Sequence, residues 1–506
     1  MTDGSQPPLP TLTARRLGLL SQHDAIVLMR EDSPVCRSEG HGPRSQVLLM
    51  AHGREVMATL YQVTGGELVQ TDEAGLSEAA WERLGVADGE EIHVRHPPAL
   101  TSMSSVRRRV YGKRLDAPSM AEIISDIAAG RYNDVHLSAF LTACSALPLD
   151  RDEVVHLTRA MVRAGEQLTW DSPVVIDKHS VGGLPGNRTT PIIVAIVAAN
   201  GLVIPKTSSR AITSPAGTAD TMETLTNVDL DLAAMRRVVE LEGGCLAWGG
   251  AMRLSPADDV LIRVERVLDI DTEGQLVASV LSKKIAAGST HVVLDIPVGP
   301  TAKVRSDDDA DAIADALTHV ARVCGVEVRC VRTDGGQPVG RGIGPALEAR
   351  DVLAVLRGDT SAPSDLRRRT CLLAGAALEL AGRCDLGEGM RLAEQTLTDG
   401  QAWAKFQRIC EAQGGLREPP RSVVNRPLLA QRSGRVMAMN NRTLARLAKL
   451  AGAPDDKAAG VELHVRLGDE IAAGEPLMTV HAEAPGELAY ALDYAAANPD
   501  MLSIEA

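Results

Sequence analysis

The chain has 506 residues, which is enough for three or four domains of ordinary size. A formal net charge of −13 disfavours binding to nucleic acid, and four Trp, five Tyr and two Phe are too few to stack on several bases. The eight Cys include no Cys-x-x-Cys pair and no His cluster lies nearby at zinc spacing, so we expect reduced thiols and no metal site. The N-terminus lacks the apolar core of a signal peptide, and the longest apolar stretch, residues 191–199, is too short to cross a bilayer. We therefore expect a cytoplasmic protein with no membrane partner.

Composition and periodicity divide the chain into a tail and four predicted domains. Residues 1–13 are polar and Pro-containing and predict a flexible tail, whereas residues 14–100 alternate in short runs between turns and predict a β-rich N-terminal domain. Residues 101–173 have helical spacing and predict a helical domain, part of which could return later in the chain. Residues 174–420 alternate strands with helices, which predicts a large α/β domain around a parallel sheet. Residues 421–506 predict a small α+β domain, so the expected fold class is multidomain α/β.

The segment from Asp177 to Asn187 is the first that carries chemistry. It follows a predicted strand, Val174–Ile176, and precedes a helix, where free backbone amides favour an anion. Lys178 adds a positive charge, Ser180 adds a hydroxyl donor, and paired glycines let the backbone approach a ligand closely. A tight structural turn would need the same glycines, so the pattern alone leaves both interpretations open. His179 could orient a phosphate or sugar, or it could simply cap the turn.

A second segment, Lys206 to Asp220, is unusually rich in hydrogen-bond donors. It holds six hydroxyls and two cations between Lys206 and Thr218, directly after a predicted buried strand. A structural loop does not need that density of donors, whereas an anionic or sugar-bearing ligand does. The segment therefore predicts a binding loop.

Weaker signals follow later in the chain. The acidic run Asp269–Glu273 offers a carboxylate for general acid catalysis, although an Asp at such a place is more often a turn former. Lys303 follows a Gly-Pro turn and could add a phosphate ligand. The loop 333–345 is Gly-rich but lacks the spacing of a dinucleotide fingerprint or a P-loop. The run Arg367–Arg369 predicts a solvated helix face rather than a binding patch.

Together these motifs resemble one known family. The run Lys178-His179-Ser180-x-Gly182-Gly183, followed by Ser208-Ser209-Arg210 and Gly217-Thr218-x-Asp220, is similar to the pattern of thymidine and pyrimidine-nucleoside phosphorylases. The run 209–214, the loop 333–345 and the extra N-terminal domain resemble the long branch of that family, the AMP phosphorylases. The resemblance covers nearly the whole chain past the tail. It implies a helical domain that faces an α/β domain across a cleft, which closes on the substrate.

The resemblance also implies roles for individual residues. Inorganic phosphate would be a co-substrate, with no cofactor, and it would be held by Lys178, His179, Ser180, Ser208 and Thr218. The nucleotide or nucleoside would be held by Gly183, Ser209, Arg210, Ala211, Ile212, Thr213, Ser214, Thr218, Ser279, Lys283 and Lys303. Asp271 matches the proton donor of AMP phosphorylases and would protonate the leaving base. The long branch also implies a homodimer or a larger homo-oligomer.

One departure from the family pattern bears on the substrate. Short-chain thymidine phosphorylases have an Arg that contacts the pyrimidine fifteen residues before the Ser that matches Ser279, and this chain has Val264 there. Arg263 and Arg266 flank that position, so a shift of one or two residues would restore the contact, and Lys283 matches the other pyrimidine contact. The sequence favours phosphorolysis of nucleoside 5′-monophosphates, AMP first and then CMP and UMP, to free base and ribose 1,5-bisphosphate. Cleavage of thymidine to thymine and 2-deoxy-α-D-ribose 1-phosphate is the alternative, and a nucleotide-binding protein without turnover is less favoured.

Overall fold

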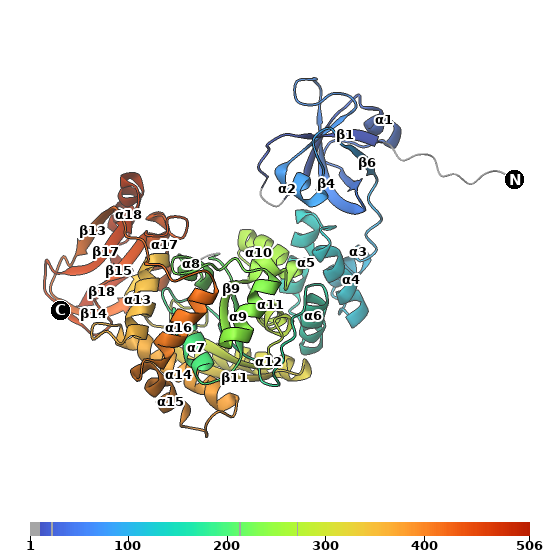
Figure 1. The fold of residues 1–506 in the computed structure, drawn as a ribbon. Coiled ribbons are helices and arrows are strands. Elements are labelled where there is room, and N and C mark those ends of the chain that lie inside the picture. The colour runs from blue at the N-terminus through green and yellow to red at the C-terminus, as the bar shows by residue number, and fades with distance from the viewer. Residues whose placement is uncertain (1–10, 22–23, 212–213, 271, 506) are drawn as a thin grey trace. The chain divides into compact units, whose positions relative to one another are not determined.

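The computed structural model describes residues 11–21, 24–211, 214–270 and 272–505. The chain forms two compact units (Figure 1). The first comprises Met1–Lys113 with Ser125–Ala143, and the second comprises Arg114–Ile124 with Cys144–Ala506.

A closed β-barrel forms the N-terminal part of the first unit, with the strand order β1-β5-β2-β4-β3-β6 (Figure 1). Alternate residues along the strands are buried, as Val27 and Met29 are on β2, because one side of each strand faces the barrel interior. The strand bounds are β1 (Thr11–Arg16), β2 (Ile26–Arg30), β3 (Gln46–Ala51), β4 (Arg54–Val63), β5 (Glu73–Leu76) and β6 (Glu91–Arg95). The predicted tail of residues 1–13 was therefore too long: Thr11–Thr13 pair with β6, and Leu12 is buried in the barrel.

Helices fill the region in which helical spacing was recognised. The short helices α1 (Pro34–Glu39) and α2 (Glu78–Leu84) accompany the barrel strands, and α3 (Met103–Val110), α4 (Ala117–Ala128), α5 (Asp134–Ala146) and α6 (Arg151–Arg163) follow. A capping box begins α6, because the Asp150 and Glu153 carboxylates each accept a hydrogen bond from the other residue's backbone N–H. The helices α10 (Pro256–Leu268) and α11 (Glu273–Ala286) pack against α6, although they come from much later in the chain.

A parallel sheet lies at the centre of the second unit. Strands β7 (Ile176–Ser180), β10 (His291–Val298) and β11 (Glu327–Asp334) pair in parallel, as do β8 (Ile204–Ser208) and β9 (Gly244–Trp248). A parallel bridge between Val175 and Val203 joins β7 to β8, which gives the order β11-β10-β7-β8-β9. The winding direction reverses between β7 and β10. Ligands of open α/β sheets bind beyond the carboxyl ends of the strands at such a point.

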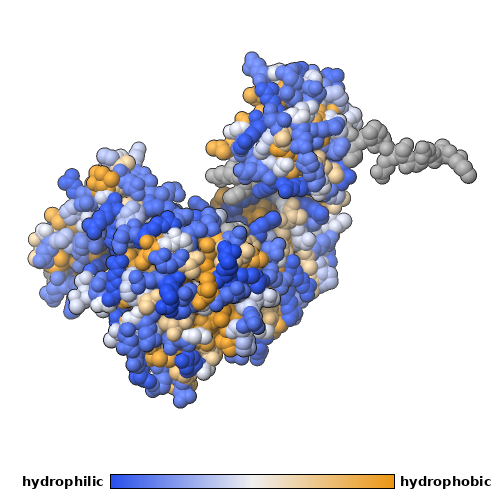
Figure 2. All heavy atoms as spheres, in the orientation of Figure 1, coloured by the Kyte–Doolittle hydropathy of each residue, from blue (hydrophilic) through white to orange (hydrophobic). Residues whose placement is uncertain are grey.

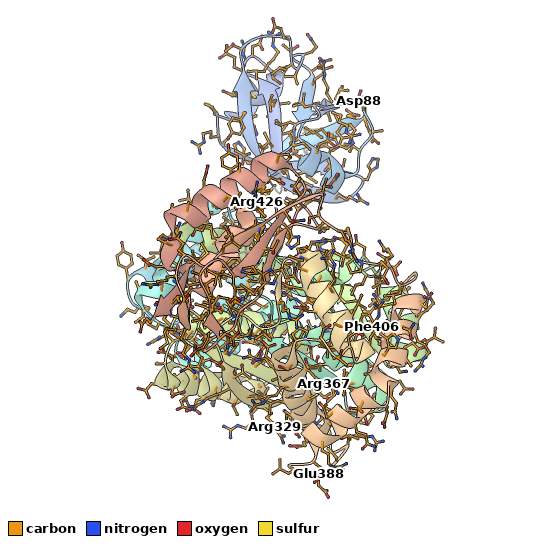
Figure 3. All side chains as sticks on the ribbon, turned by 90° about the vertical axis from the view of Figure 1, so that its left-hand side faces the viewer. Asp88, Arg329, Arg367, Glu388, Phe406 and Arg426 are labelled. Atoms are coloured by element: carbon orange, nitrogen blue, oxygen red, sulfur yellow. The ribbon has the colours of Figure 1, made fainter. Side chains whose placement is uncertain are left out.

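Helices that pack around this sheet bury a large apolar core. Helix α7 (Thr189–Ala199) is buried along almost its whole length, since it packs against α14 and α16 as well as the sheet. The other elements are α8 (Thr218–Glu223), α9 (Leu232–Glu242), η1 (Gly249–Met252), α12 (Asp307–Val323), α13 (Pro345–Arg357), α14 (Ser364–Leu380), α15 (Gly389–Thr398) and α16 (Gln401–Ala412). Phe406 of α16 is fully buried among these helices, whereas Glu388 extends outward (Figure 3).

The prediction that Arg367–Arg369 form a solvated helix face was only partly right. Arg368 is exposed, but Arg367 forms an ion pair with Glu394 at 2.6 Å, and Arg369 donates a hydrogen bond to the backbone carbonyl of Asp334. Helix α14 packs against β10 and β11, so one side of this basic run is turned toward the sheet.

The C-terminal segment combines the sheet β12-β15-β17-β13 with the sheet β16-β14-β18, and α17 packs against α18. Their bounds are β12 (Gly342–Ile343), β13 (Val424–Leu429), β14 (Gly434–Met439), α17 (Asn441–Leu450), β15 (Gly460–Leu463), β16 (Glu470–Ile471), β17 (Pro476–Ala482), α18 (Pro485–Ala497), η2 (Pro499–Met501) and β18 (Leu502–Glu505). Strand β12 lies outside residues 421–506, so the predicted C-terminal segment misses one strand of its own sheet.

Hydrophilic residues cover most of the surface visible in Figure 2, with apolar residues in smaller patches between them. Within the described ranges, no helix has both the length and the apolar character needed to span a bilayer.

Candidate active site

Lys178 lies inside the sheet rather than in the turn predicted for it. The predicted strand ended at Asp177, but β7 continues to Ser180 because it pairs with β10 over its whole length. The Lys178 side chain is 2% exposed, and its Nζ donates a hydrogen bond to Thr189 Oγ1 at 2.9 Å and lies 3.8 Å from Asp295 Oδ2. Burial lowers the pKa of Lys178 to about 8, although the Asp295 carboxylate favours the charged form. A buried cation so loosely paired can attract a second anion.

Ser180 is held at the carboxyl end of β7 by a polar network. It is the register partner of Asp295 on β10, at the point where the winding reverses. Asp295 accepts hydrogen bonds from Thr333 Oγ1 at 2.6 Å and from Asn187 Nδ2 at 3.2 Å, and Asn187 Nδ2 lies 3.4 Å from Ser180 Oγ. Asn187 has a φ of +55°, a left-handed conformation that Asn tolerates better than most residues and that is concentrated at functional sites.

Thr218, the first residue of α8, is oriented by Arg188. The Arg188 guanidinium donates to Thr218 Oγ1 at 2.9 Å, to the Ala216 carbonyl at 3.0 Å and to Glu348 Oε2 at 2.6 Å. Burial raises the pKa of Glu348 to about 7 despite the neighbouring guanidinium. Because the Thr218 hydroxyl accepts a hydrogen bond from Arg188, its own proton is available to a ligand. Arg188 thus adds a second cation to this region, and sequence analysis did not predict it.

Ser208 stands at the carboxyl end of β8. Strand β8 is joined to β7 by the parallel bridge between Val175 and Val203, so Ser208 and Ser180 end neighbouring parallel strands. Its Oγ lies 3.3 Å from the Ala247 carbonyl oxygen, to which it donates a hydrogen bond. Two of the predicted phosphate-binding hydroxyls therefore lie on adjacent strands, at the edge where α/β sheets bind ligands.

The loop after β8 is closed by Asp220. Its carboxylate accepts hydrogen bonds from the backbone N–H groups of Ala211 at 2.6 Å and Gly217 at 2.9 Å. Gly217 cannot be replaced without movement, because a Cβ there would lie 2.4 Å from the Ser209 carbonyl oxygen. Ser214 Oγ donates to the Ala216 carbonyl at 3.0 Å. The described part of the loop is thus folded back on itself.

Arg210 is engaged by protein groups rather than left open to a ligand. Its guanidinium forms an ion pair with Glu223 at 2.8 Å and lies over the Trp248 ring, 4.8 Å from the ring centroid. Lys457 of the C-terminal segment forms an ion pair with the same Glu223 at 2.8 Å. Arg210 therefore shapes the loop in this structure and links it to the C-terminal segment.

A buried charge cluster lies at the start of β7. Asp177 is 1% exposed and forms ion pairs with Lys206 at 3.2 Å and Lys284 at 3.0 Å. Burial alone would raise the pKa of Asp177, but the two ammonium groups together lower it. Burial, reinforced by Lys284 and Lys206, holds the pKa of His179 well below its ordinary value. His179 is therefore neutral at pH 7 and does not add a cation to the site.

Ser279 and Lys283, on successive turns of α11, meet one buried carboxylate. Asp258 Oδ2 accepts a hydrogen bond from Ser279 Oγ at 3.0 Å and pairs with Lys283 Nζ at 2.5 Å. Burial alone would lower the pKa of Lys283, but the carboxylates of Asp258, Asp259 and Glu265 together raise it. Val264 is buried on the continuous helix α10, where each residue is rotated by about 100° from the last. Arg263 and Arg266 therefore leave α10 in other directions than Val264 does.

Gly183 and Lys303 lie in direct contact. Gly183 has a φ of +81°, and a Cβ on it would lie 2.3 Å from the Lys303 backbone nitrogen. Only glycine fits both the conformation and the space. The structure thus brings together two residues that are 120 positions apart in the sequence. The side chain of Lys303 is exposed.

The remaining predicted residues, Ile212, Thr213 and Asp271, lie outside the described residues. Several residues of the site were not predicted, among them Asn187, Arg188, Asp258 and Glu348. Asn187 and Arg188 directly follow the Gly-rich turn, which was a usable signal. Nothing in the sequence indicates that Asp258 or Glu348 would contact the predicted site.

The fold and the site together define an α/β protein in which cations and hydroxyls gather at the carboxyl ends of the parallel strands. The chain matches three family descriptions: the helical bundle domain of a glycosyl transferase family over residues 104–165, the a/b domain of that family over residues 172–403, and the pyrimidine nucleoside phosphorylase C-terminal domain over residues 435–501.

Curated relatives match over nearly the full length. A protein of Chelativorans sp. named "Putative thymidine phosphorylase" is 66% identical and covers 99% of this chain and 98% of its own. A protein of the same name from Tolumonas auensis is 61% identical and covers 99% of each chain. This chain therefore belongs to the thymidine and pyrimidine-nucleoside phosphorylase family, and it is a pentosyltransferase.

Solved structures support the fold at lower identity. Anthranilate phosphoribosyltransferase from Thermus thermophilus is 22% identical, with a TM-score of 0.50, and covers 61% of this chain and 99% of its own. The enzyme of the same name from Saccharomyces cerevisiae is 17% identical, also with a TM-score of 0.50, and covers 62% of this chain and 98% of its own. Such similarity shows a shared fold over about three fifths of this chain.

Proposed function

We propose that this enzyme cleaves nucleoside 5′-monophosphates, AMP first, with inorganic phosphate, and releases the free base and ribose 1,5-bisphosphate. One arrangement of side chains is its main support. Two cations shielded from solvent, Lys178 and Arg188, accompany the hydroxyls of Ser180, Ser208 and Thr218 at the edge of the sheet where ligands bind. Such an arrangement suits a phosphate anion that must be positioned and stripped of water.

Each group then has a part in the proposed reaction. Phosphate, held by Lys178 and the hydroxyls, attacks C1 of the sugar as the N-glycosidic bond breaks through an oxocarbenium-like state. The departing adenine needs a proton on a ring nitrogen, and Asp271 is the proposed donor. In the sequence Asp271 lies between the end of α10 at Leu268 and the start of α11 at Glu273. Helix α11 also carries Ser279 and Lys283, which are proposed to contact the nucleobase. In the sequence, the proposed general acid therefore comes just before the helix that would hold the nucleobase.

The polar groups around Ser279 suit a base that donates hydrogen bonds. Asp258 holds both Ser279 and Lys283, and a carboxylate accepts hydrogen bonds but cannot donate them when ionised. The amino groups of adenine and cytosine are donors of this kind, and the N3–H that uracil and thymine share is another. Val264 is buried and contributes no cation for a pyrimidine carbonyl, which supports AMP over thymidine.

Thymidine phosphorolysis is the second candidate function. The relatives that are 66% and 61% identical over nearly the whole chain are both named "Putative thymidine phosphorylase". The same phosphate site would serve both reactions. The two candidates differ in the base and in the 5′-phosphate, so they are separated by substrate rather than by mechanism.

Release of free base from AMP, CMP, UMP, thymidine and uridine, each with and without inorganic phosphate, separates these functions. We expect phosphate-dependent release from the monophosphates and none from the nucleosides. Release from thymidine alone would establish the second candidate. Tight AMP binding by calorimetry without base release from any substrate would contradict both.

The KM for inorganic phosphate is expected to rise above about pH 8, by about tenfold per pH unit. Burial lowers the pKa of Lys178 to about 8, so this group loses its proton and its charge as the pH rises through that value. Phosphate itself is already a dianion in this range, so the change belongs to the enzyme. Steady-state kinetics from pH 6 to pH 10 at saturating AMP measure it, with the KM for AMP as the internal control. A phosphate KM that stays flat between pH 8 and pH 10 would remove Lys178 from the phosphate site.

Replacing Arg188 with glutamine is expected to raise the KM for phosphate by about 10- to 100-fold and to change the KM for AMP much less. The variant removes a cation and leaves the Thr218 hydroxyl free to turn away from the ligand. Arg188→Lys keeps the charge beside Glu348 and should recover part of the loss. Arg322→Gln, an exposed position on α12, is the matched control. If folded Arg188→Gln protein had the wild-type phosphate KM, Arg188 would have only a structural role.

A further inference from the structure

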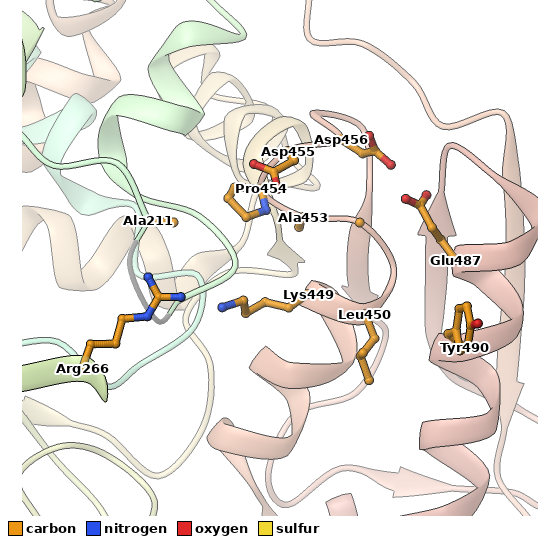
Figure 4. A pocket seen from close by; sticks show the side chains of 11 residues that line it. Ala211, Arg266, Lys449, Leu450, Ala453, Pro454, Asp455, Asp456, Glu487 and Tyr490 are labelled. Carbon is orange, nitrogen blue, oxygen red and sulfur yellow. The ribbon is translucent and has the colours of Figure 1, made fainter. Parts of the chain in front are cut away.

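A cavity of about 540 Å³ lies beside the loop that follows β8 (Figure 4). Its walls come from three parts of the second unit: Ala211 of the loop, Arg266 near the end of α10, and residues of the C-terminal segment that include Lys449, Asp456 and Glu487. None of these residues except Ala211 belongs to the site described above.

Two cations face each other on one side of this cavity. Figure 4 shows the Arg266 and Lys449 side chains, from α10 and α17, pointing toward one another. Within the described residues, neither side chain takes part in an ion pair or a hydrogen bond. Burial lowers the pKa of Lys449, and the charges of Arg266 and Arg446 add to that effect against the opposing charge of Asp455. Asp455 also lines the cavity, but its charge offsets only part of the repulsion between the cations, so a further anion between Arg266 and Lys449 would be stabilised.

The opposite side of the cavity has the opposite charge. Asp456 and Glu487 lie there (Figure 4), and a hydrogen bond with Asp456 raises the pKa of Glu487. Carboxyl groups repel a phosphate, so an anionic ligand in this cavity would be confined to the Arg266 and Lys449 side. The charge distribution thus selects both the sign of the ligand and its position.

The cavity adjoins the proposed nucleotide loop. Ala211 forms part of its wall and donates its backbone N–H to Asp220. Lys457, one residue past the cavity-lining Asp456, forms an ion pair with Glu223, which also holds Arg210. The C-terminal segment therefore both lines the cavity and supports the loop, so a nucleotide held by the loop could present its phosphate to this cavity.

We propose that Arg266 and Lys449 bind the 5′-phosphate of the nucleotide substrate, and the same phosphate in ribose 1,5-bisphosphate after cleavage. This inference rests on the proposed function, and it identifies which residues distinguish a nucleotide from a nucleoside. It also assigns a role in substrate selection to the C-terminal segment through Lys449. The same pair could hold a free phosphate ion, and the experiment separates these two sources.

Arg266→Gln, Lys449→Gln and the double variant test this site in the full-length enzyme. With AMP as substrate at saturating phosphate, each single change is expected to raise the KM by about 10-fold and the double change by about 100-fold or more. Adenosine binding, measured by calorimetry, should stay unchanged in all three variants. Arg442→Gln, an exposed position on the same helix as Lys449, is the matched control and should behave as wild type.

Three other results would contradict this inference, and each has a different consequence. An unchanged KM for AMP in the double variant, in an enzyme whose wild type cleaves AMP, would overturn the Arg266 and Lys449 site and leave the proposed function intact. A rise in the KM for inorganic phosphate alone would assign the pair to free phosphate instead. A wild-type enzyme that cleaves thymidine and not AMP would overturn the proposed function and this inference together.

Discussion

Replacing Asp271 with asparagine is expected to lower kcat for AMP by about 100- to 10,000-fold, while AMP still binds with nearly wild-type affinity. The asparagine amide is close in size to the carboxyl group but cannot donate a catalytic proton to the leaving adenine. Because the loss is confined to the transition state, kcat and kcat/KM should fall together. Steady-state kinetics with AMP and calorimetric titration of the same variant measure the two parts of this prediction.

Asp269→Asn is the matched control for this experiment. Asp269 ends α10 with a φ of +52°, a conformation in which Asn is at least as favourable as Asp. The change therefore removes a nearby acidic group without disturbing the helix end, and kcat should stay close to wild type. Unchanged AMP turnover in the Asp271→Asn variant would exclude Asp271 as the general acid.

Replacing Asp177 with asparagine is expected to lower the free energy of unfolding by about 3–5 kcal/mol. The carboxylate is the buried counter-ion of Lys206 and Lys284, so its loss leaves two ammonium groups without compensation inside the protein. Burial lowers the pKa of Lys284, so this lysine can lose its proton, and the destabilisation should shrink as the pH rises. Urea unfolding followed by circular dichroism at pH 7 and pH 9 measures both effects.

Asp171→Asn provides the comparison, since Asp171 is exposed and only six residues away. Its unfolding free energy should stay within about 0.5 kcal/mol of wild type. A loss below about 1 kcal/mol in the Asp177→Asn variant would show that the cluster is not maintained by this carboxylate.

Much of the second unit's architecture could be predicted, because its signals are local. The apolar run that becomes α7, placed between two short apolar strands, predicts a βαβ unit, and the parallel bridge between Val175 and Val203 joins those strands. The residue at which a strand ends was harder to predict. Lys178 is polar and was assigned to a turn, yet it lies in β7 because Asp295 and Thr189 provide partners for its charge. Tertiary pairing of this kind is not visible in one segment of sequence.

The residues of the candidate site likewise divide into those that local sequence patterns predict and those that only tertiary contacts bring in. Ser180, Ser208 and Thr218 were recognisable because donors crowd into two short segments near predicted strand ends. Asp258 was not, since its contact with Ser279 depends on how α10 packs beside α11. Glu348 belongs to α13 and reaches Arg188 across 160 positions of sequence. Arg266 was noticed only as a neighbour of Val264, and its position beside Lys449 depends on the fold of the whole second unit.

The most direct test of the proposed function is the product of AMP cleavage. Phosphorus NMR of the enzyme with AMP and inorganic phosphate should show phosphate consumed as two new phosphate-ester signals of equal intensity appear, from ribose 1,5-bisphosphate, in step with free adenine. Ribose 5-phosphate with no consumption of inorganic phosphate would mean hydrolysis and would contradict the phosphate site. No reaction of AMP, with thymidine cleaved under the same conditions, would contradict the proposed substrate and leave the phosphate site standing.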